Sequence, residues 1–294
     1  MRGSHALRTW NDNMKLGFDL LLWTTHVTDA HWPIIERLKA TGYDGVEVPM
    51  FEGTPDHYEK LGRRLRDIGL EATGVGVMAN GNAISPDYAQ RAGALAHLQW
   101  LADCTAALGG TLVCGPFHQP LGEFSGRGPT EDEIAWCVEV HKQAAQYAAR
   151  QGVAYSVEPL NRFECYFLNT MEQAASLVRR VDEPNYGYLF DTFHTNIEEN
   201  AVPPLIASTI AQINHVHITE NNRGVPGAGH IDFQSVFNAL KRAGYDGWLT
   251  IEAFGSALPD LAAATKIWRP LFASEADVYE KGYKLMREGW DRAG

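Results

Sequence analysis

Short apolar runs alternate with longer amphipathic stretches from Lys15 to the end of the chain, and the alternation occurs eight times. This pattern is typical of βα units, in which each strand is followed by a helix and the strands form a parallel sheet. One closed barrel of eight such units takes about 250 residues, which suits a chain of 294. The sequence therefore predicts one α/β domain over residues 14–294 with the fold of a (β/α)8 TIM barrel.

The expected elements follow from the apolar periods and from the turn and capping residues between them. We expect strands at residues 15–23, 45–49, 71–78, 111–117, 153–158, 188–191, 213–220 and 248–254. We expect helices at residues 29–42, 55–68, 86–108, 130–150, 170–181, 203–211, 232–243 and 274–290. Residues 117–129 are rich in Gly and Pro and too irregular for a helix, so we expect a loop that covers the substrate.

Charge and cysteine pattern exclude several classes of protein. The formal net charge of −11 disfavours nucleic acid as a partner, because such binding depends on clustered Lys and Arg. The four cysteines lie far apart without a C-x-x-C pair, so we expect reduced thiols in a cytoplasmic protein. No apolar run reaches the length of about 20 residues that crosses a membrane. Residues 1–13 begin M-R-G-S-H, which is typical of an expression tag, and we expect them to be disordered.

Four consecutive strands are expected to end in a side chain that can bind a metal ion. These side chains are Glu158, Asp191, His217 and Glu252. The active site of such a barrel lies where the C-terminal ends of its strands meet, so we expect the four to converge. Three carboxylates and one imidazole suit Mn²⁺, Mg²⁺ or Co²⁺ better than a thiolate-preferring ion, and we expect manganese. A single strand-end acid is more often a helix N-cap or an ion-pair partner, but four in register favour a site.

Other polar residues near the strand ends have structural alternatives. His215 shares a face with His217 but lies one layer deeper, so we expect a neutral core histidine and not a ligand. Arg223, after strand seven, is placed to reach an oxygen of a bound substrate, whereas for Arg162 an ion pair with a nearby acid is the alternative. The G-V-G at residues 74–76 lacks the rest of the dinucleotide fingerprint, so a Rossmann domain is rejected.

Four motifs surround these residues, namely E-P-L-N-R-F-E at 158–164, D-T-F-H-T-N-I-E-E at 191–199, H-V-H-I-T-E-N-N-R at 215–223 and I-E-A-F at 251–254. From Lys15 onward the chain resembles the D-tagatose 3-epimerase family, the ketose 3-epimerases within the xylose-isomerase-like barrels. The resemblance implies that Glu158, Asp191, His217 and Glu252 bind the metal, usually manganese. It also implies that Glu158 and Glu252 exchange protons with the substrate, and that Glu164, His194 and Arg223 hold substrate oxygens. A homodimer or homotetramer is expected from the same resemblance.

An enzyme of this kind removes the C3 proton of a ketose, forms a cis-enediolate, and returns a proton to the opposite face. The expected substrates are free ketoses of the D-tagatose, D-fructose, D-psicose and L-ribulose type. The chain departs from the family after strands one, two and four, where we expect Phe18, Trp23 and Phe117 to form an apolar wall over the far end of the sugar, with core packing as the alternative for Phe18. The alternative functions are an aldose–ketose or hydroxypyruvate-type isomerase, an apurinic endonuclease, and a sugar-binding regulator without catalysis.

Overall fold

Each strand pairs in parallel with the next one along the chain, and β8 pairs with β1 to close a barrel of eight strands. The computed structural model describes residues 14–294, so the predicted N-terminal segment 1–13 lies outside the described residues. The strands are β1 (Lys15–Asp19), β2 (Gly45–Pro49), β3 (Glu71–Val75), β4 (Leu112–Gly115), β5 (Ala154–Val157), β6 (Tyr186–Asp191), β7 (Ile213–Ile218) and β8 (Trp248–Ile251). The predicted (β/α)8 barrel is confirmed.

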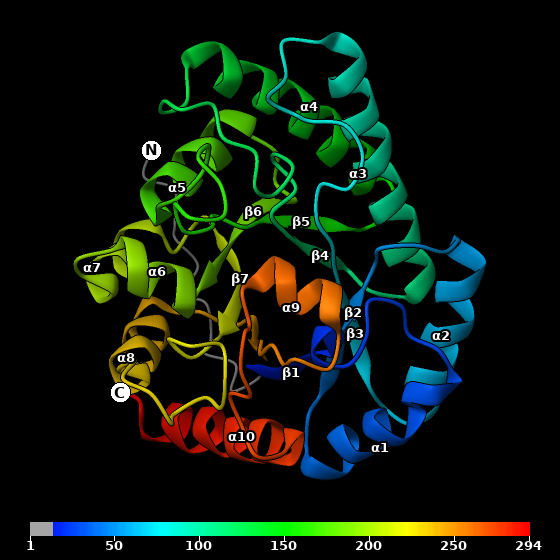
Figure 1. Ribbon diagram of the computed structural model, residues 1–294, viewed down its shortest axis with the longest axis vertical. Helices are drawn as coiled ribbons and strands as arrows, with labels where there is room; N and C mark the ends of the chain where they lie inside the picture. The colour runs from blue at the N-terminus through cyan, green and yellow to red at the C-terminus, as the bar shows by residue number, and fades with distance from the viewer. Residues whose placement is uncertain (1–13) are drawn as a thin grey trace, which may run out of the picture.

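Helices surround the barrel as an outer ring, except for a short late helix, residues 259–265, that lies across the barrel (Figure 1). They are α1 (Trp32–Thr41), α2 (Pro55–Asp67), α3 (Tyr88–Leu108), α4 (Glu131–Ala149), α5 (Met171–Val181), α6 (Thr192–Glu198), α7 (Val202–Thr209), α8 (Phe233–Ala243), α9 (Pro259–Thr265) and α10 (Glu275–Arg292), with short 3-10 turns η1 (Leu20–Leu22) and η2 (Asp29–His31). Thr130 and Glu133 form a reciprocal capping box that starts α4, as the sequence predicts. Residues 117–129 contain no helix or strand.

Two helices and one early strand end differ from the sequence prediction. Strand one stops at Asp19, because its carboxylate accepts a hydrogen bond from the backbone N–H of Leu21 and starts η1. The short helix α6 begins directly after β6, with Asp191 as its N-cap. Helix α9 starts with a proline in its first turn, within a stretch that the sequence left without structure. The first two differences come from a side-chain cap and the third from a proline at the helix start, and the apolar period reveals none of them.

Strand register decides which side chains face the inside of the barrel. Successive residues of a strand point alternately inward and outward. Asp19 of β1 lies beside Glu47 of β2, and Asp191 of β6 lies beside His217 of β7. The outward residues meet the helices, as Ile251 does at Gly282 of α10, where a Cβ on the glycine would lie 3.0 Å from the isoleucine. The inward side chains at these strand ends are polar, as Asp19, Glu47, Asp191 and His217 show.

No helix within residues 14–294 combines the length and the apolar character needed to span a bilayer. The four cysteines are all buried and unpaired.

Candidate active site

The four predicted metal ligands meet at the C-terminal end of the barrel. Asp191 ends β6 and His217 lies in β7, while Glu158 and Glu252 directly follow β5 and β8. The Nδ1 atom of His217 lies 3.5 Å from Oε1 of Glu252 and 3.9 Å from Oδ2 of Asp191. One ligand atom from each of Glu158, Asp191 and His217 also lies within 4.8 Å of the other two. All four side chains are buried.

Three atoms of this group are buried without a hydrogen-bond partner among the described residues. They are Oε1 of Glu158, Oε2 of Glu252 and Nδ1 of His217. A buried polar atom costs free energy unless it is paired, so three such atoms in one place point to a missing partner. Carboxylate oxygens and an imidazole nitrogen are ligands that Mn²⁺, Mg²⁺ and Co²⁺ accept. The residues therefore fit a divalent cation.

Burial and mutual repulsion affect the protonation of the site. Burial, together with the charge of Glu252, raises the pKa of Asp191 to about 6. The same two causes raise the pKa of Glu158 well above its ordinary value. Burial alone would lower the pKa of His217, but the carboxylate of Glu47 raises it above the ordinary range. A bound cation would oppose the first two shifts, because positive charge favours the ionised carboxylates.

Asp191 is held rigidly by hydrogen bonds to both of its carboxylate oxygens. Its Oδ1 accepts from the backbone N–H groups of Phe193 at 2.6 Å and His194 at 3.0 Å, which caps α6. Its Oδ2 accepts from the hydroxyl of Thr219 at 2.6 Å and faces His217. Asp191 thus caps α6 and faces the proposed metal position at the same time. Its role as cap explains why α6 begins directly at the end of β6.

The residues predicted to hold substrate oxygens also lie together. Nη2 of Arg223 lies 3.2 Å from Oε1 of Glu164 and 3.0 Å from Nε2 of His194. The backbone N–H of Asn161 donates to Nδ1 of His194 at 2.9 Å, so Nδ1 is the acceptor and the neutral ring carries its proton on Nε2. Nε2–H and the guanidinium nitrogen 3.0 Å from it are then two donors that face each other without an acceptor. An oxygen placed between them would satisfy both, next to Glu158, whose Oε1 is 3.5 Å from Nε2.

Arg223 is fixed in an unusual backbone conformation. It has a φ of 62°, in the left-handed region that few non-glycine residues adopt. Its guanidinium lies over the rings of Phe193 at 4.1 Å and Phe254 at 5.0 Å, and the side chain is buried. Its carbonyl accepts a hydrogen bond from the backbone N–H of Phe254 at 2.9 Å. Such conformations persist when surrounding contacts hold them, and they concentrate at functional sites.

Two of the three residues expected to form an apolar wall over the sugar, Phe18 and Phe117, are fully buried, whereas Trp23 remains a prediction. Phe18 is fully buried and packs against Tyr43 at 5.6 Å, on the outward face of β1 toward α10. Its neighbour Asp19 takes the inward position, because alternate residues of a strand face opposite sides. Trp23 follows η1 and is half-buried, with its ring 5.0 Å from that of Phe18. The placement of Phe18 as a substrate contact is therefore wrong.

Phe117 lies in the same kind of environment. It is fully buried, and its ring packs against Tyr155 at 5.6 Å and against His141 of α4 at 6.1 Å. It belongs to the layer between the strands and the helices, so its assignment to the wall is also wrong. Apolar side chains reach the mouth from elsewhere, since α9 lies across the barrel in Figure 1 and contributes to a cluster whose members include Leu21, Phe254, Ala262 and Ile267.

Several functional positions were missed by sequence reasoning. Asp19 is buried at the mouth, and its Oδ2 has no hydrogen-bond partner among the described residues. Asn161 and Thr219 position His194 and Asp191. The signal for Asp19 is the inward alternation of strand one, which points to it once the strand is known to end there. Asn161 lies inside the N-R-F-E motif, but its bond to a histidine 33 residues away has no signal in the sequence.

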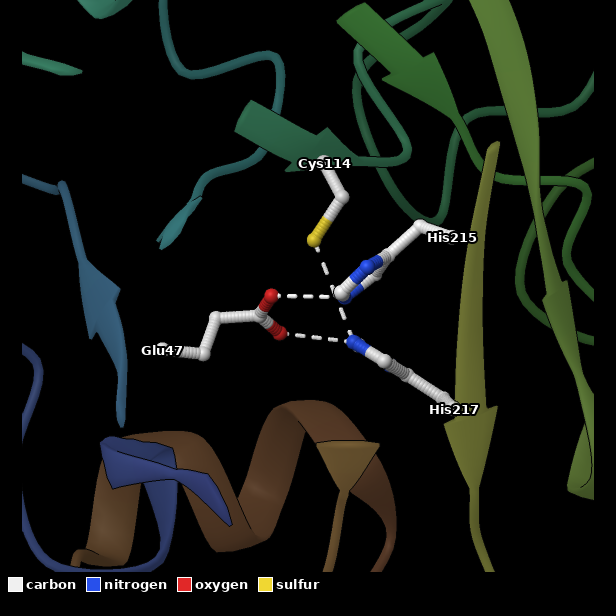
Figure 2. A group of neighbouring side chains, drawn as sticks. All are labelled: Glu47, Cys114, His215 and His217. Carbon is white, nitrogen blue, oxygen red and sulfur yellow. Dashed lines mark hydrogen bonds and ion pairs between the residues drawn. The ribbon is translucent and has the colours of Figure 1, made fainter. Parts of the chain in front are cut away.

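A second group of side chains lies one layer below the site, and Figure 2 shows it. Glu47 of β2 faces both His215 and His217, with Nε2 atoms 2.8 and 2.6 Å from its two oxygens. The pKa of His215 is lowered by burial, in keeping with the neutral core histidine that the sequence predicts. Cys114 completes the group, and burial raises the pKa of its thiol. The short contacts among these side chains favour a hydrogen-bonded support for the site over a second metal centre.

Ketose 3-epimerases are among the known proteins with a similar sequence and structure. Residues 35–288 match the family described as xylose isomerase-like TIM barrel. A ketose 3-epimerase of Arthrobacter globiformis is 31% identical over 279 residues, which are 94% of this chain and 96% of that protein. An L-ribulose 3-epimerase of Methylomonas sp. is 31% identical and covers 94% of this chain and 97% of its own. The structure of a D-allulose 3-epimerase from Methylomonas sp. in complex with D-allulose has a TM-score of 0.87 at 28% identity, covering 95% of this chain and 98% of that one.

Proposed function

We infer that this chain, which belongs to the xylose isomerase-like TIM barrel family, is a metal-dependent ketose 3-epimerase. Its relatives are isomerase-class enzymes named for ketose, L-ribulose and D-psicose 3-epimerisation. The proposed substrates are free ketoses of the D-tagatose, D-fructose, D-psicose and L-ribulose type, which are interconverted with their C3 epimers.

The observation that carries this proposal is the placement of two glutamates around one imidazole. Glu158 follows β5 and Glu252 follows β8, with β6 and β7 between them, so the two carboxylates reach the site from different sides. Each has a buried oxygen without a hydrogen-bond partner. Inversion at a carbon requires two such groups, because one removes a proton and the other delivers a proton to the opposite face.

The proposed reaction moves one proton off C3 and another onto it. The ionised carboxylate of one glutamate takes the C3 proton, and the electrons of the C–H bond pass to the C2 carbonyl oxygen. This step gives a planar cis-enediolate. The other glutamate starts protonated and donates to the opposite face of C3, while the electrons return from oxygen to carbon.

Glu158, Asp191, His217 and Glu252 would hold the divalent ion, for which we propose manganese. When bound, such an ion stabilises the negative charge that develops on the oxygens at C2 and C3. The Nε2–H of His194 and the guanidinium of Arg223 donate to a substrate oxygen in the same region. Glu164 orients Arg223 through their 3.2 Å ion pair and offers an acceptor for a sugar hydroxyl.

Asp19 adds an acceptor on the β1 side of the mouth. Its Oδ1 accepts from Leu21, whereas its Oδ2 is buried and without a partner. In register it lies beside Glu47, and Phe18, one residue earlier, lies beside Ile251, one residue before Glu252. We propose that Oδ2 accepts a hydrogen bond from a sugar hydroxyl, in place of the apolar contact expected from Phe18.

The proposal is tested by incubating the protein with Mn²⁺ and D-fructose, D-tagatose or L-ribulose in deuterium oxide. We expect the C3 epimer of at least one ketose, with deuterium at C3, because each proton donor exchanges with solvent between turnovers. An aldose product would instead identify an aldose–ketose isomerase. A protein that binds Mn²⁺ but leaves C3 unexchanged in every ketose would contradict the proposal.

A further inference from the structure

We propose that Glu47 is a positioning residue that fixes the ring of His217 and makes its Nδ1 the metal-binding atom. The inference rests on the proposed function, because it concerns the same site, but it makes a claim about metal binding that needs no sugar. Glu47 comes from β2 and His217 from β7, so the contact spans the inside of the barrel (Figure 2).

The hydrogen bonds around Glu47 define its protonation without reference to the metal. Its Oε1 lies 2.6 Å from Nε2 of His217, and its Oε2 lies 2.8 Å from Nε2 of His215. The hydroxyl of Thr73, beside Glu47 in the β2–β3 register, donates to Oε2 at 2.8 Å. Nε2 of His217 and the hydroxyl of Thr73 each donate to one oxygen of this carboxyl group, and Nε2 of His215 makes a close ion-pair contact, so Glu47 accepts through both oxygens.

The choice of nitrogen in His217 follows from that arrangement. A carboxylate only accepts hydrogen bonds, so Nε2 of His217 must carry a hydrogen. A metal would bind only the neutral ring, which carries one N–H, so with Nε2 as the donor it is Nδ1 that would offer its lone pair. Nδ1 has no hydrogen-bond partner and faces Glu252 and Asp191 at 3.5 and 3.9 Å. A histidine that binds a metal through one nitrogen commonly donates its other N–H to a carboxylate, which sets the tautomer and the ring orientation.

Packing gives Glu47 no freedom to change this assignment. Glu47, His215 and His217 are all fully buried, and Sγ of Cys114 lies 3.8 Å from Nε2 of His217. The ring of His215 lies 5.2 Å from that of His217, nearly perpendicular to it. Rotation of the His217 ring about χ2 would break the bond to Glu47 and place carbon atoms against a carboxylate. The carboxylate of Glu47, one layer below the site, thus keeps Nδ1 of His217 pointing toward the proposed metal position.

The variant Glu47→Gln tests this inference, because the amide it introduces offers a donor as well as an acceptor. When the donor faces His217, the hydrogen of the ring moves to Nδ1 and points into the metal site. We expect the dissociation constant for Mn²⁺, measured from the free-ion EPR signal in the absence of sugar, to rise about 10- to 100-fold. Thr73→Val, which removes one of the hydrogen bonds that hold Glu47, should weaken Mn²⁺ binding in the same direction but less.

Glu133→Gln is the matched control. Glu133 is also a buried carboxylate with several hydrogen bonds, but it caps α4 on the outside of the barrel, so its variant should bind Mn²⁺ as the unaltered protein does. Nitrogen-15 NMR of the metal-free protein, at a pH high enough for the His217 ring to be neutral, gives a second readout: the hydrogen lies on Nε2 in the unaltered protein and is divided between the Nε2–H and Nδ1–H tautomers in Glu47→Gln.

Unchanged Mn²⁺ affinity in Glu47→Gln, with an unchanged His217 tautomer, would overturn the inference while leaving the proposed function intact. Should Glu47→Gln fail to fold, Thr73→Val decides the question, and an affinity equal to that of the unaltered protein would count against Glu47. Weakened Mn²⁺ binding in a protein that epimerises no ketose would support the role of Glu47 and contradict only the proposed reaction.

Discussion

The backbone N–H of Asn161 donates to Nδ1 of His194 over 2.9 Å, and this bond leaves the other nitrogen of the ring as a donor 3.5 Å from Oε1 of Glu158. The backbone of Asn161 thereby determines which nitrogen of His194 carries the hydrogen, although His194 belongs to another βα unit. The ring remains neutral, because burial and the neighbouring Arg223 lower the pKa of His194 well below its ordinary value.

Replacing His194 with phenylalanine should therefore weaken turnover without weakening metal binding. The variant removes one donor to a charged or developing oxygen, which is worth about 1.5–3 kcal/mol, so we expect kcat/KM for the best ketose to fall about 10- to 100-fold. Mn²⁺ affinity should change little, because His194 is not among the ligands. Rates should be compared well below both melting temperatures, since Asn161 loses its acceptor. An unchanged kcat/KM in His194→Phe would show that His194 does not donate to a substrate oxygen.

Replacing Glu252 with glutamine should separate proton exchange from inversion. Loss of one acid–base group costs about 10²- to 10⁴-fold in rate, so epimerisation should nearly cease. In the epimer whose C3 hydrogen points toward Glu158, this glutamate can still remove the proton and return a deuteron to the same face. Mass spectrometry in deuterium oxide with saturating Mn²⁺ should thus detect deuterium at C3 of one epimer without formation of the other. Epimerisation at the unaltered rate in Glu252→Gln would show that this glutamate is not the second catalyst.

The metal-free protein should lose stability as the pH rises through the range where Asp191 ionises. Its pKa is raised from 3.8 to about 6 by burial and by Glu252, so the folded state binds this proton more tightly than the unfolded state. The stabilisation is complete below the unfolded pKa and is lost as the pH rises through the folded value, between about pH 4 and 6. Melting temperatures in the presence of a chelator should fall over this window, and less so in Asp191→Asn. Saturating Mn²⁺ should suppress the fall, and an equal fall in both proteins would contradict the assignment.

Asp19 and Phe18 should respond in opposite ways to substitution. Asp19→Asn should keep the cap on η1 through its side-chain oxygen and change kcat/KM unequally among D-fructose, D-tagatose and L-ribulose. Phe18→Ala should lower the free energy of unfolding by about 3–5 kcal/mol, as expected for a buried aromatic ring, with unchanged preference among the same sugars. An equal effect of Asp19→Asn on every ketose and on its 1-deoxy and 6-deoxy analogues would argue against a contact with a sugar hydroxyl.

Much of the fold and the ligand set follows from local patterns. The period of the apolar runs reports strands and helices, and a barrel brings strand ends together whatever the details of its helices. Glu158, Asp191, His217 and Glu252 could thus be selected from their positions alone. The expected dimer or tetramer stays a prediction.

What could not be predicted depends on a cap or on contacts between distant segments. Phe18 was preferred to Asp19 because the end of β1 is set by one bond from Leu21 to the Asp19 carboxylate, and aromatic residues near a mouth look like sugar platforms. Glu47 lies 170 residues from His217 in the sequence, and no motif near either residue predicts their contact. A buried acid can bind a metal, cap a helix or hold another side chain in place. Its neighbours in the folded chain decide which of these it does.

The hydrogen bond from Phe254 to the carbonyl of Arg223 ties the loop after β7 to the chain that carries Glu252, two residues before Phe254. A sugar held by the Arg223 guanidinium, as proposed, would therefore be connected through this hydrogen bond to the backbone that carries Glu252, the proposed catalyst. Variants of this loop that are selected for a new ketose should lose turnover unless Phe254 is varied in the same library.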